Sequence, residues 1–508
     1  MTAPVATEER SYRFAPLDRT GWMLGLGGAQ CLAIAAGILV AGFLLQLRAA
    51  APFVIAPVVV AAAFGFGSWD GRAAHEWAPV LIRYNAQRAL TRQRWSAPLP
   101  LLTGTTADRS TAPPLPPFLD GLELLDAGAV SWCPATRDAG VGVVRDRRDR
   151  TVSASIAIRG REFSLVERAD QERIIQHWGD ALAGFCTERG SVVRVRVTEW
   201  SAPSGVADHE RFVAEHGADS ASNEARRAYD DLLAEAGPMA VRHEALVTVT
   251  VDPRRVRGRR AAENAEAQAV EVLLEEVRLL SVRMETAGLA VDPPLSMTRT
   301  AETLRVRLDP SAAGPITTRA ASLAQLAGIV SPYSAGPLAV SAEWGHVRVD
   351  GSCHRAYWIA QWPRLDVGPN WLEPLLLHAG GVRTFAIHYE PVPPSRSQRR
   401  IDRDSTRLAA DEEQRSRAGF RIGARHRRAQ SAVLERESEL VAGYAELEYA
   451  GFVIVSAPDV ETLTRSCSEY EQVAAQAGLE LRSLEGRHDL GVICALPVGR
   501  GIAPRRIG

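Results

Sequence analysis

The chain has 508 residues, a formal net charge of −1 at pH 7 and 46% hydrophobic residues. This length and composition suit two or three globular units and exclude wholesale disorder, and the near-neutral charge argues against a surface built throughout for nucleic acid. All 59 basic residues are arginine, which excludes a Schiff-base lysine, a lysine general base and a P-loop lysine.

Two uncharged apolar segments follow a short N-terminal tail over 1–20. The first segment, 21–47, is about 40 Å long as a helix, which exceeds a hydrocarbon core of about 30 Å. The second segment, 51–69, begins a few residues later, after a turn around Arg48. The first segment is too long for a signal peptide and the second follows at once, so we predict a transmembrane helical hairpin over 21–69.

Both ends of this hairpin are expected in the cytoplasm. Arginines precede the first segment and follow the second, whereas the turn contains only Arg48, and the positive-inside rule places arginine-rich flanks on the cytoplasmic side. We therefore predict a plasma-membrane protein with two spans and two cytoplasmic termini. The six cysteines form no CxxC pair, which agrees with a reduced cytosolic part and indicates no zinc knuckle.

Small residues form a ridge along the first apolar segment. Glycine or alanine recurs at every fourth position, namely Gly21, Gly25, Ala29, Ala33, Gly37 and Ala41. Such residues let helix backbones approach closely in lipid, so we expect the ridge to pack against the second segment or a partner subunit.

An amphipathic helix is predicted over 70–95. Trp77, Leu81 and Tyr84 line one face while arginines lie toward the others, as in a helix that rests on the bilayer surface. A buried amphipathic helix of the soluble part is the alternative. A Pro-, Thr- and Ser-rich linker is predicted over 96–120.

Strand and helix patterns alternate through the rest of the chain. Strand patterns occur near 140–160, 191–200, 243–253, 288–293, 342–363, 382–392, 448–458 and 479–483, and helix patterns near 167–190, 207–236, 260–287, 371–381, 395–443 and 458–477. The order hairpin, helix, strand, long helix, strand, helix, strand occurs twice, offset by about 190–200 residues. We therefore predict an α+β fold with two similar cytoplasmic lobes, 121–330 and 331–508, each a mixed sheet covered by helices.

The sequence offers no signature of nucleotide or zinc chemistry. It contains no GxxxxGK[ST] motif, so the Walker B-like strand at 247–252 is interpreted as an ordinary buried strand, and 499–506 is too glycine-poor for a phosphate cradle. His75 and His243 each lack the second histidine of HExxH. We therefore expect no enzyme activity, and we assign no catalytic, cofactor-binding or metal-binding residue and no cofactor.

Cys353 and His354 are adjacent in a predicted strand, so their side chains point to opposite faces and cannot form a catalytic dyad with each other. The expected faces are Cys353, Tyr357 and Ile359 on one side and His354, Trp358 and Trp362 on the other. We interpret the segment as a sheet strand with one aromatic-rich face.

Arginines concentrate in the long polar helix. Residues 394–428 contain eleven arginines and five acidic residues, and a second cluster lies at 253–260. A solvated helix face with internal ion pairs is one interpretation. The other is docking, either onto an acidic partner such as a motor ATPase or onto DNA phosphates. Phe420 is the only aromatic residue among these arginines, so protein docking ranks above DNA contact.

Two stretches carry a family resemblance. The tight hairpin and the "FxxxxxG…W…IRY…L…RxRW" pattern after it resemble the PrgI family, small membrane proteins of Gram-positive conjugation-type (type IV) secretion machines. The matching residues are Phe66, Gly71, Trp77, Ile82, Arg83, Tyr84, Leu90, Arg92, Arg94 and Trp95. Through 357–363, 451–463 and 494–501, the remainder is similar to the N-terminal, non-motor region of VirB-type conjugation ATPases.

The whole arrangement, a PrgI-like hairpin plus lobes without a motor, resembles a family of membrane proteins from high-GC Gram-positive bacteria. The resemblance implies a non-enzymatic inner-membrane scaffold or coupling component of a type IV secretion apparatus. Such a component would dock a separate VirB-type ATPase, contact other membrane subunits and the lipid bilayer, and assemble as an oligomer within a complex. The alternatives are a membrane subunit of a type VII-like secretion complex, or a membrane-tethered enzyme with a degenerate nucleotide site.

Overall fold

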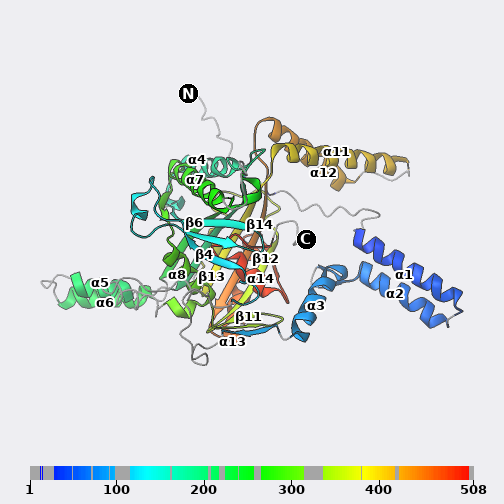
Figure 1. Ribbon diagram of the computed structural model, residues 1–508, viewed down its shortest axis with the longest axis horizontal. Helices are drawn as coiled ribbons and strands as arrows, with labels where there is room; N and C mark the ends of the chain where they lie inside the picture. The colour runs from blue at the N-terminus through cyan, green and yellow to red at the C-terminus, as the bar shows by residue number, and fades with distance from the viewer. Residues whose placement is uncertain are drawn as a thin grey trace, which may run out of the picture.

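Figure 1 shows the computed structural model of the chain. The structure describes residues 12, 14, 28–48, 50–69, 72–90, 92–97, 115–160, 163–203, 207–216, 223–237, 240–256, 265–313, 336–378, 380–417 and 423–502. Most of the predicted linker over 96–120, and Gly21, Gly25 and Phe420, lie outside the described residues.

Helices and strands alternate along the chain, as the sequence predicts. The helices are α1 (Gly28–Gln46), α2 (Ala51–Phe66), α3 (Ala74–Ala89), α4 (Arg168–Ala183), α5 (Ala207–His216), α6 (Asn223–Ala236), α7 (Ala265–Thr286), α8 (Met297–Leu308), α10 (Glu373–Leu376), α11 (Pro394–Arg417), α12 (Ala424–Val441), α13 (Val460–Gln476) and α14 (His488–Cys494). A two-stranded ladder of β1 (Ser68–Trp69) and β2 (Arg72–Ala73) separates α2 from α3.

One large sheet contains the remaining strands. They are β3 (Arg94–Ser96), β4 (Leu122–Asp126), β5 (Gly142–Asp146), β6 (Thr151–Arg159), β7 (Val192–Pro203), β8 (Val241–Val251), β9 (Ala290–Pro294), β10 (Ala339–Ala342), β11 (Val347–Val349), β12 (Ser352–Gln361), β13 (Val382–Pro391), β14 (Leu447–Ala457) and β15 (Glu480–Ser483). Their order is β3-β10-β11-β12-β14-β13-β7-β8-β6-β5-β4, with β15 beside β12 and β9 beside β6. The predicted α+β class is confirmed.

The prediction of mixed sheets is wrong, because every strand pairing among the described residues is antiparallel. A helix joins β6 to β7, which is typical of parallel neighbours. However, β8 lies between these two strands and pairs antiparallel with both. In the same way, β14 lies between β12 and β13. Each crossover therefore skips one position in the sheet.

The two halves of the sheet have the same strand order. From the centre outward, β7, β8, β6, β5 and β4 of one half correspond to β13, β14, β12, β11 and β10 of the other, and β9 corresponds to β15. The halves meet where β7 pairs with β13, from Val195 opposite Tyr389 to Ser201 opposite Arg383. The predicted repeat of elements is therefore present, but both copies belong to one continuous sheet.

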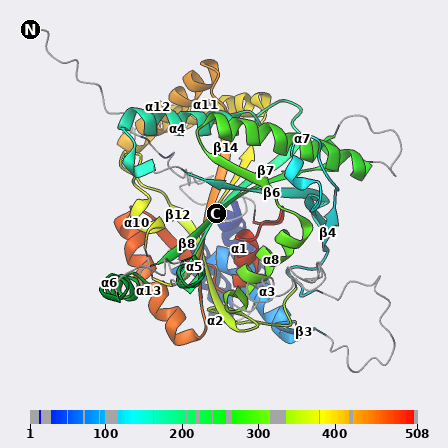
Figure 2. The same ribbon diagram turned by 90° about the vertical axis from the view of Figure 1, so that its left-hand side faces the viewer.

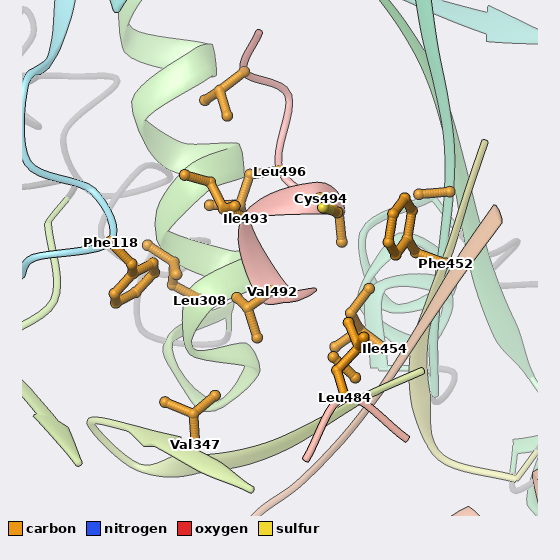
Figure 3. Close-up of a cluster of buried hydrophobic side chains, with 14 of the residues drawn as sticks. Phe118, Leu308, Val347, Phe452, Ile454, Leu484, Val492, Ile493, Cys494 and Leu496 are labelled. Carbon is orange, nitrogen blue, oxygen red and sulfur yellow. The ribbon is translucent and has the colours of Figure 1, made fainter. Parts of the chain in front are cut away.

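The register separates the sheet into two faces. On the first face, α4 and α7 cover one half over a core that includes Ile156 and Val247, and α10 and α13 cover the other half over Tyr357 and Val453. Figure 2 shows α4 and α7 side by side across one side of the sheet. The second face is covered by α8 and α14, and Leu308 of α8 and Val492 of α14 belong to one core cluster there (Figure 3).

Three predicted helices differ from expectation. The predicted helix over 207–236 is two helices, α5 and α6, and the long polar helix over 395–443 is likewise divided into α11 and α12. Each pair forms a helical arm that projects from the sheet (Figure 1). The apolar stretch at 371–381 forms only the four-residue α10, and its leucines pack against α13, with Leu375 buried.

Within the predicted transmembrane hairpin over 21–69, the structure describes the two helices α1 and α2. Among the residues that the structure describes, no helix is both long enough and apolar enough to cross a bilayer.

Candidate anchoring and docking surfaces

The helices α1 and α2 present their large apolar side chains to the outside. Leu39 is 74% exposed and Phe53 is 68% exposed. Others of this kind with at least 40% exposure are Leu32, Ile38, Val40, Phe43, Leu45, Ile55, Val58, Val59, Val60 and Phe66. An apolar surface of this extent marks a site for a membrane or a protein partner.

The small-residue ridge packs against α2, which is one of the two targets that the sequence predicts for it. A Cβ added at Gly37 would lie 2.4 Å from the Cβ of Ala61, and Gly37 is buried. At the other end, the Gln30 side chain donates a hydrogen bond of 2.7 Å to the backbone oxygen of Gly65. The small residues therefore bring the two backbones together, and the larger side chains point away.

Helix α3 joins this hairpin to the sheet body. The Trp77 ring stacks on Trp344 with 5.9 Å between centroids, and Tyr84 meets the same ring edge-on at 5.0 Å. Arg83 donates a hydrogen bond of 3.1 Å to Asp489 of α14. Burial raises the pKa of Asp489, although Arg83 opposes the shift. These contacts favour the alternative in which the helix belongs to the globular part.

A buried arginine holds the segment after α14. Arg196 of β7 has no exposed surface and donates hydrogen bonds to the backbone oxygens of Ile493 at 3.1 Å, Leu496 at 2.5 Å and Arg500 at 2.5 Å. Burial lowers the pKa of Arg196 to about 9, so the side chain keeps its charge at neutral pH. Charged donors of this kind make stronger hydrogen bonds than neutral ones.

One ion pair and one hydrogen bond tie the same segment to the first half of the sheet. Arg500 donates to both carboxylate oxygens of Asp146, at 2.5 and 2.7 Å, and both side chains are buried. Arg194 donates to the backbone oxygen of Gly499 at 2.7 Å and pairs with Glu390 at 2.6 Å. The segment from 495 to 502 therefore crosses from the second half of the chain onto the first.

Two glycines let this segment approach the sheet. A Cβ at Gly499 would lie 2.7 Å from Cγ2 of Thr250, and one at Gly501 would lie 2.6 Å from Nη2 of Arg196. The described part of 499–506 is thus used for close packing. Sequence reasoning missed this arrangement. Its signal is the alternation of arginine with valine in β7, which is equally typical of a solvent-exposed face.

Cys353 and His354 lie on opposite faces of β12, as predicted. Cys353 joins Tyr357 and Ile359 in the core under α13. His354 is fully buried, with Nε2 at 2.8 Å from the Leu308 backbone oxygen and Nδ1 at 2.8 Å from Oγ of Ser456. The hydrogen bonds occupy both ring nitrogens, and burial lowers the pKa of His354 to about 4.

The prediction for Trp362 is wrong. Its side chain packs on the Cys353 face of the sheet, where it contacts Phe14, Trp371 and Tyr449. The register of β12 against β15 shifts between Ile359 and Gln361, and the strand ends at Gln361. Strict alternation therefore fails beyond this irregularity.

The Walker B-like strand is part of β8 in the interior of the sheet. Val247, Val249 and Val251 are fully buried, and the Asp252 carboxylate accepts hydrogen bonds from the backbone and side chain of Arg254. Partial burial acts to raise the pKa of Asp252, but the Arg254 bonds outweigh it and lower the pKa.

A cavity of about 400 Å³ lies near the start of α8, between β6, β8 and β9. Arg159, His243 and Arg299 line it, but each has an acidic partner, respectively Asp292, Glu199 and Glu302. None of the residues singled out in the sequence for nucleotide chemistry lines this cavity. No group of three potential ligands for a metal ion occurs within the described ranges.

The predicted basic helix is only partly an internal ion-pair network. Arg400 pairs with Glu446 and Glu448, and Arg415 and Arg417 pair with acidic residues four positions earlier. In contrast, the exposed arginines without an ion pair to any described residue include Arg403, Arg427 and Arg428. The ion-pair interpretation therefore holds for part of the arm, and docking of the other arginines stays a prediction.

The chain matches no protein-family model and no curated protein sequence.

Proposed function

We propose that this protein is a non-enzymatic, membrane-anchored scaffold, with its sheet body on the cytoplasmic side of the plasma membrane. The exposed apolar surface of α1 and α2 carries the proposal, because side chains of this size are rarely left in water over two whole helices. Insertion of these side chains among the lipid acyl chains would hold the protein at the bilayer. The contacts of α3 with Trp344 and Asp489 support a firm connection to the body.

The role that fits this architecture best is a scaffold of a type IV, conjugation-like secretion apparatus, which couples a separate VirB-type ATPase and other membrane subunits to the channel. The resemblance to PrgI-like proteins and to the non-motor region of VirB-type ATPases supports this role. The absence of lysine from the whole chain also supports it, since a motor of the P-loop type needs that side chain at the phosphates.

Membrane anchoring is tested by vesicle flotation. The purified full chain is mixed with phosphatidylglycerol–phosphatidylcholine vesicles and compared with a variant that carries serine at Leu39, Phe43, Phe53 and Val59. Each buried apolar side chain contributes roughly 1.5–3 kcal/mol, so we expect the vesicle-bound fraction to fall at least tenfold. The control places serine at Leu165 and Leu365, which are 81% and 80% exposed on the body, and should float like wild type. Equal flotation of all three proteins would contradict the proposal.

The coupling role needs a partner of defined identity. We expect the full chain, captured in detergent from cells that encode it, to retain a VirB-type ATPase identified by mass spectrometry. The purified protein alone should not hydrolyse ATP. Turnover of ATP without a companion subunit, or retention of a type VII secretion set in place of the ATPase, would assign the protein to another class.

A further inference from the structure

The two helical arms occupy equivalent places in the two halves of the sheet. Helices α5 and α6 connect β7 to β8, and α11 and α12 connect β13 to β14. Because β7 and β13 are antiparallel neighbours at the centre, equivalent connections leave the sheet in opposite directions. Figure 1 shows the α5–α6 arm on one side of the molecule and the α11–α12 arm on the other.

The arms carry opposite charge. Residues 207–236 contain eight acidic residues and three arginines, whereas 394–441 contain twelve arginines and eight acidic residues. On α6, Asp230, Asp231 and Glu235 are exposed, and none has an ion pair with another residue in the described ranges. Among the described residues they have no ion-pair partner, and the same is true of Arg427 and Arg428 on α12.

Each arm also leaves apolar side chains exposed beside these charges. On the acidic arm, Phe212 and Leu232 are each 57% exposed. On the basic arm, Leu434 is 64% exposed and Val441 is 81% exposed. Arg427, Leu434 and Val441 are spaced by seven residues, so they share one helix face. Helix α6 has no buried residue among those described, so its own packing does not account for its amphipathic pattern.

We propose that the acidic α5–α6 arm of one copy docks on the basic α11–α12 arm of a second copy. The occupant is another copy of this chain because one molecule carries both complementary surfaces, and these surfaces lie on opposite sides of it (Figure 1). The two surfaces differ, so the contact is head-to-tail and repeats until it closes into a ring or extends as a row. This inference concerns self-association and does not depend on membrane anchoring.

The test uses charge reversal with the full chain in detergent micelles, which cover the apolar hairpin. Sedimentation velocity over a concentration series compares wild type with D231R/E235R and with R427E/R428E. We expect wild type to form larger species that dissociate at high salt, since surface charge pairs are screened. Each variant alone should remain monomeric, and an equimolar mixture of the two should restore the larger species. A control that exchanges Arg278 and Glu275, an exposed ion pair on α7, should behave as wild type.

Three results would overturn the proposal. The first is a wild type that stays monomeric at every concentration, and the second is a mixture of variants that fails to reassociate. The third is loss of an identified VirB-type ATPase in R427E/R428E while this variant still forms the larger species seen for wild type, which would assign the basic arm to that ATPase. None of these variants alters α1 or α2, so vesicle flotation reports separately on the membrane anchor.

Discussion

A single buried guanidinium, Arg196, supplies hydrogen bonds to three backbone oxygens of the segment after α14. In Arg196→Met these oxygens lose their donors inside the protein, and a buried acceptor without a partner costs about 1–3 kcal/mol. We therefore expect the free energy of unfolding to fall by about 2 kcal/mol or more, and trypsin to cleave at Arg500 faster than in wild type. Urea unfolding and the masses of the tryptic fragments measure the two effects.

The matched control is Arg137→Met, which removes an exposed arginine outside both helical arms that has no ion pair with a described residue. It should leave the stability and the cleavage at Arg500 unchanged. If Arg196→Met is cleaved at the wild-type rate, Arg196 does not hold the segment in place.

His354 makes the fold sensitive to acid. Burial lowers its pKa to about 4, below the value of about 6.5 in an unfolded chain, so the folded state prefers the neutral ring. This contribution is complete above about pH 6.5 and is lost as the pH falls toward 4, by up to roughly 3 kcal/mol. We expect His354→Gln to lose less stability between pH 7 and pH 4.5 than wild type does.

Urea unfolding at the two pH values gives this difference. His388 is also fully buried, and burial together with nearby arginines lowers its pKa, so the acid effect should decrease in His354→Gln without disappearing. An unchanged acid effect in His354→Gln would show that His354 is not a source of it.

At the scale of single elements, the packing of α3 on the sheet body depends on the indole ring of Trp344. Trp344 contacts both Trp77 and Tyr84, and each aromatic pair contributes about 1 kcal/mol beyond its buried area. We expect Trp344→Ala to release α3, with hydrogen exchange over 74–89 at least tenfold faster. Trp344→Phe keeps an aromatic ring at this place and should exchange more slowly than the alanine variant. Equal exchange in wild type and Trp344→Ala would mean that the bond between Arg83 and Asp489 is enough to hold α3 on the sheet body.

The sequence predicts where helices and strands occur better than it predicts what they pack against. Alternation in 191–200 and 243–253 indicates strands because period two requires one covered face. The same pattern does not show whether the polar side of these strands is buried. It would predict that residues such as Arg196, Thr198 and Thr248 are solvent-exposed, although they are fully buried. Only the tertiary fold, which places α8, α14 and the segment after α14 over them, decides this.

Periodicity also carries no information on strand order. The repeated order of elements is visible in the sequence, but it cannot show that β8 inserts between β6 and β7, or that β7 and β13 join the halves. For the candidate surfaces, the sequence identifies the apolar hairpin and the basic helix. It misses the acidic arm, because an amphipathic helix normally covers a core, whereas α6 covers none.

At the scale of the whole molecule, the shared sheet makes the two predicted lobes depend on each other. A cut within 314–335 would expose β7 and β13 as long edge strands, which favour aggregation. We expect the fragments 115–330 and 331–508 to be insoluble when expressed separately and to form a soluble pair when co-expressed. Size-exclusion chromatography detects the pair. A soluble monomer with cooperative unfolding from either fragment alone would show two independent domains.

The bond between Arg500 and Asp146 links residues 354 positions apart in the chain. During synthesis, every strand of the sheet leaves the ribosome before this arginine does. The polar side of β6, β7 and β8 is therefore covered by the segment after α14 only when translation has passed residue 500. Nascent chains that stall earlier would display serine, threonine and arginine side chains to solvent, and a chaperone or protease could use that surface to distinguish them from finished molecules.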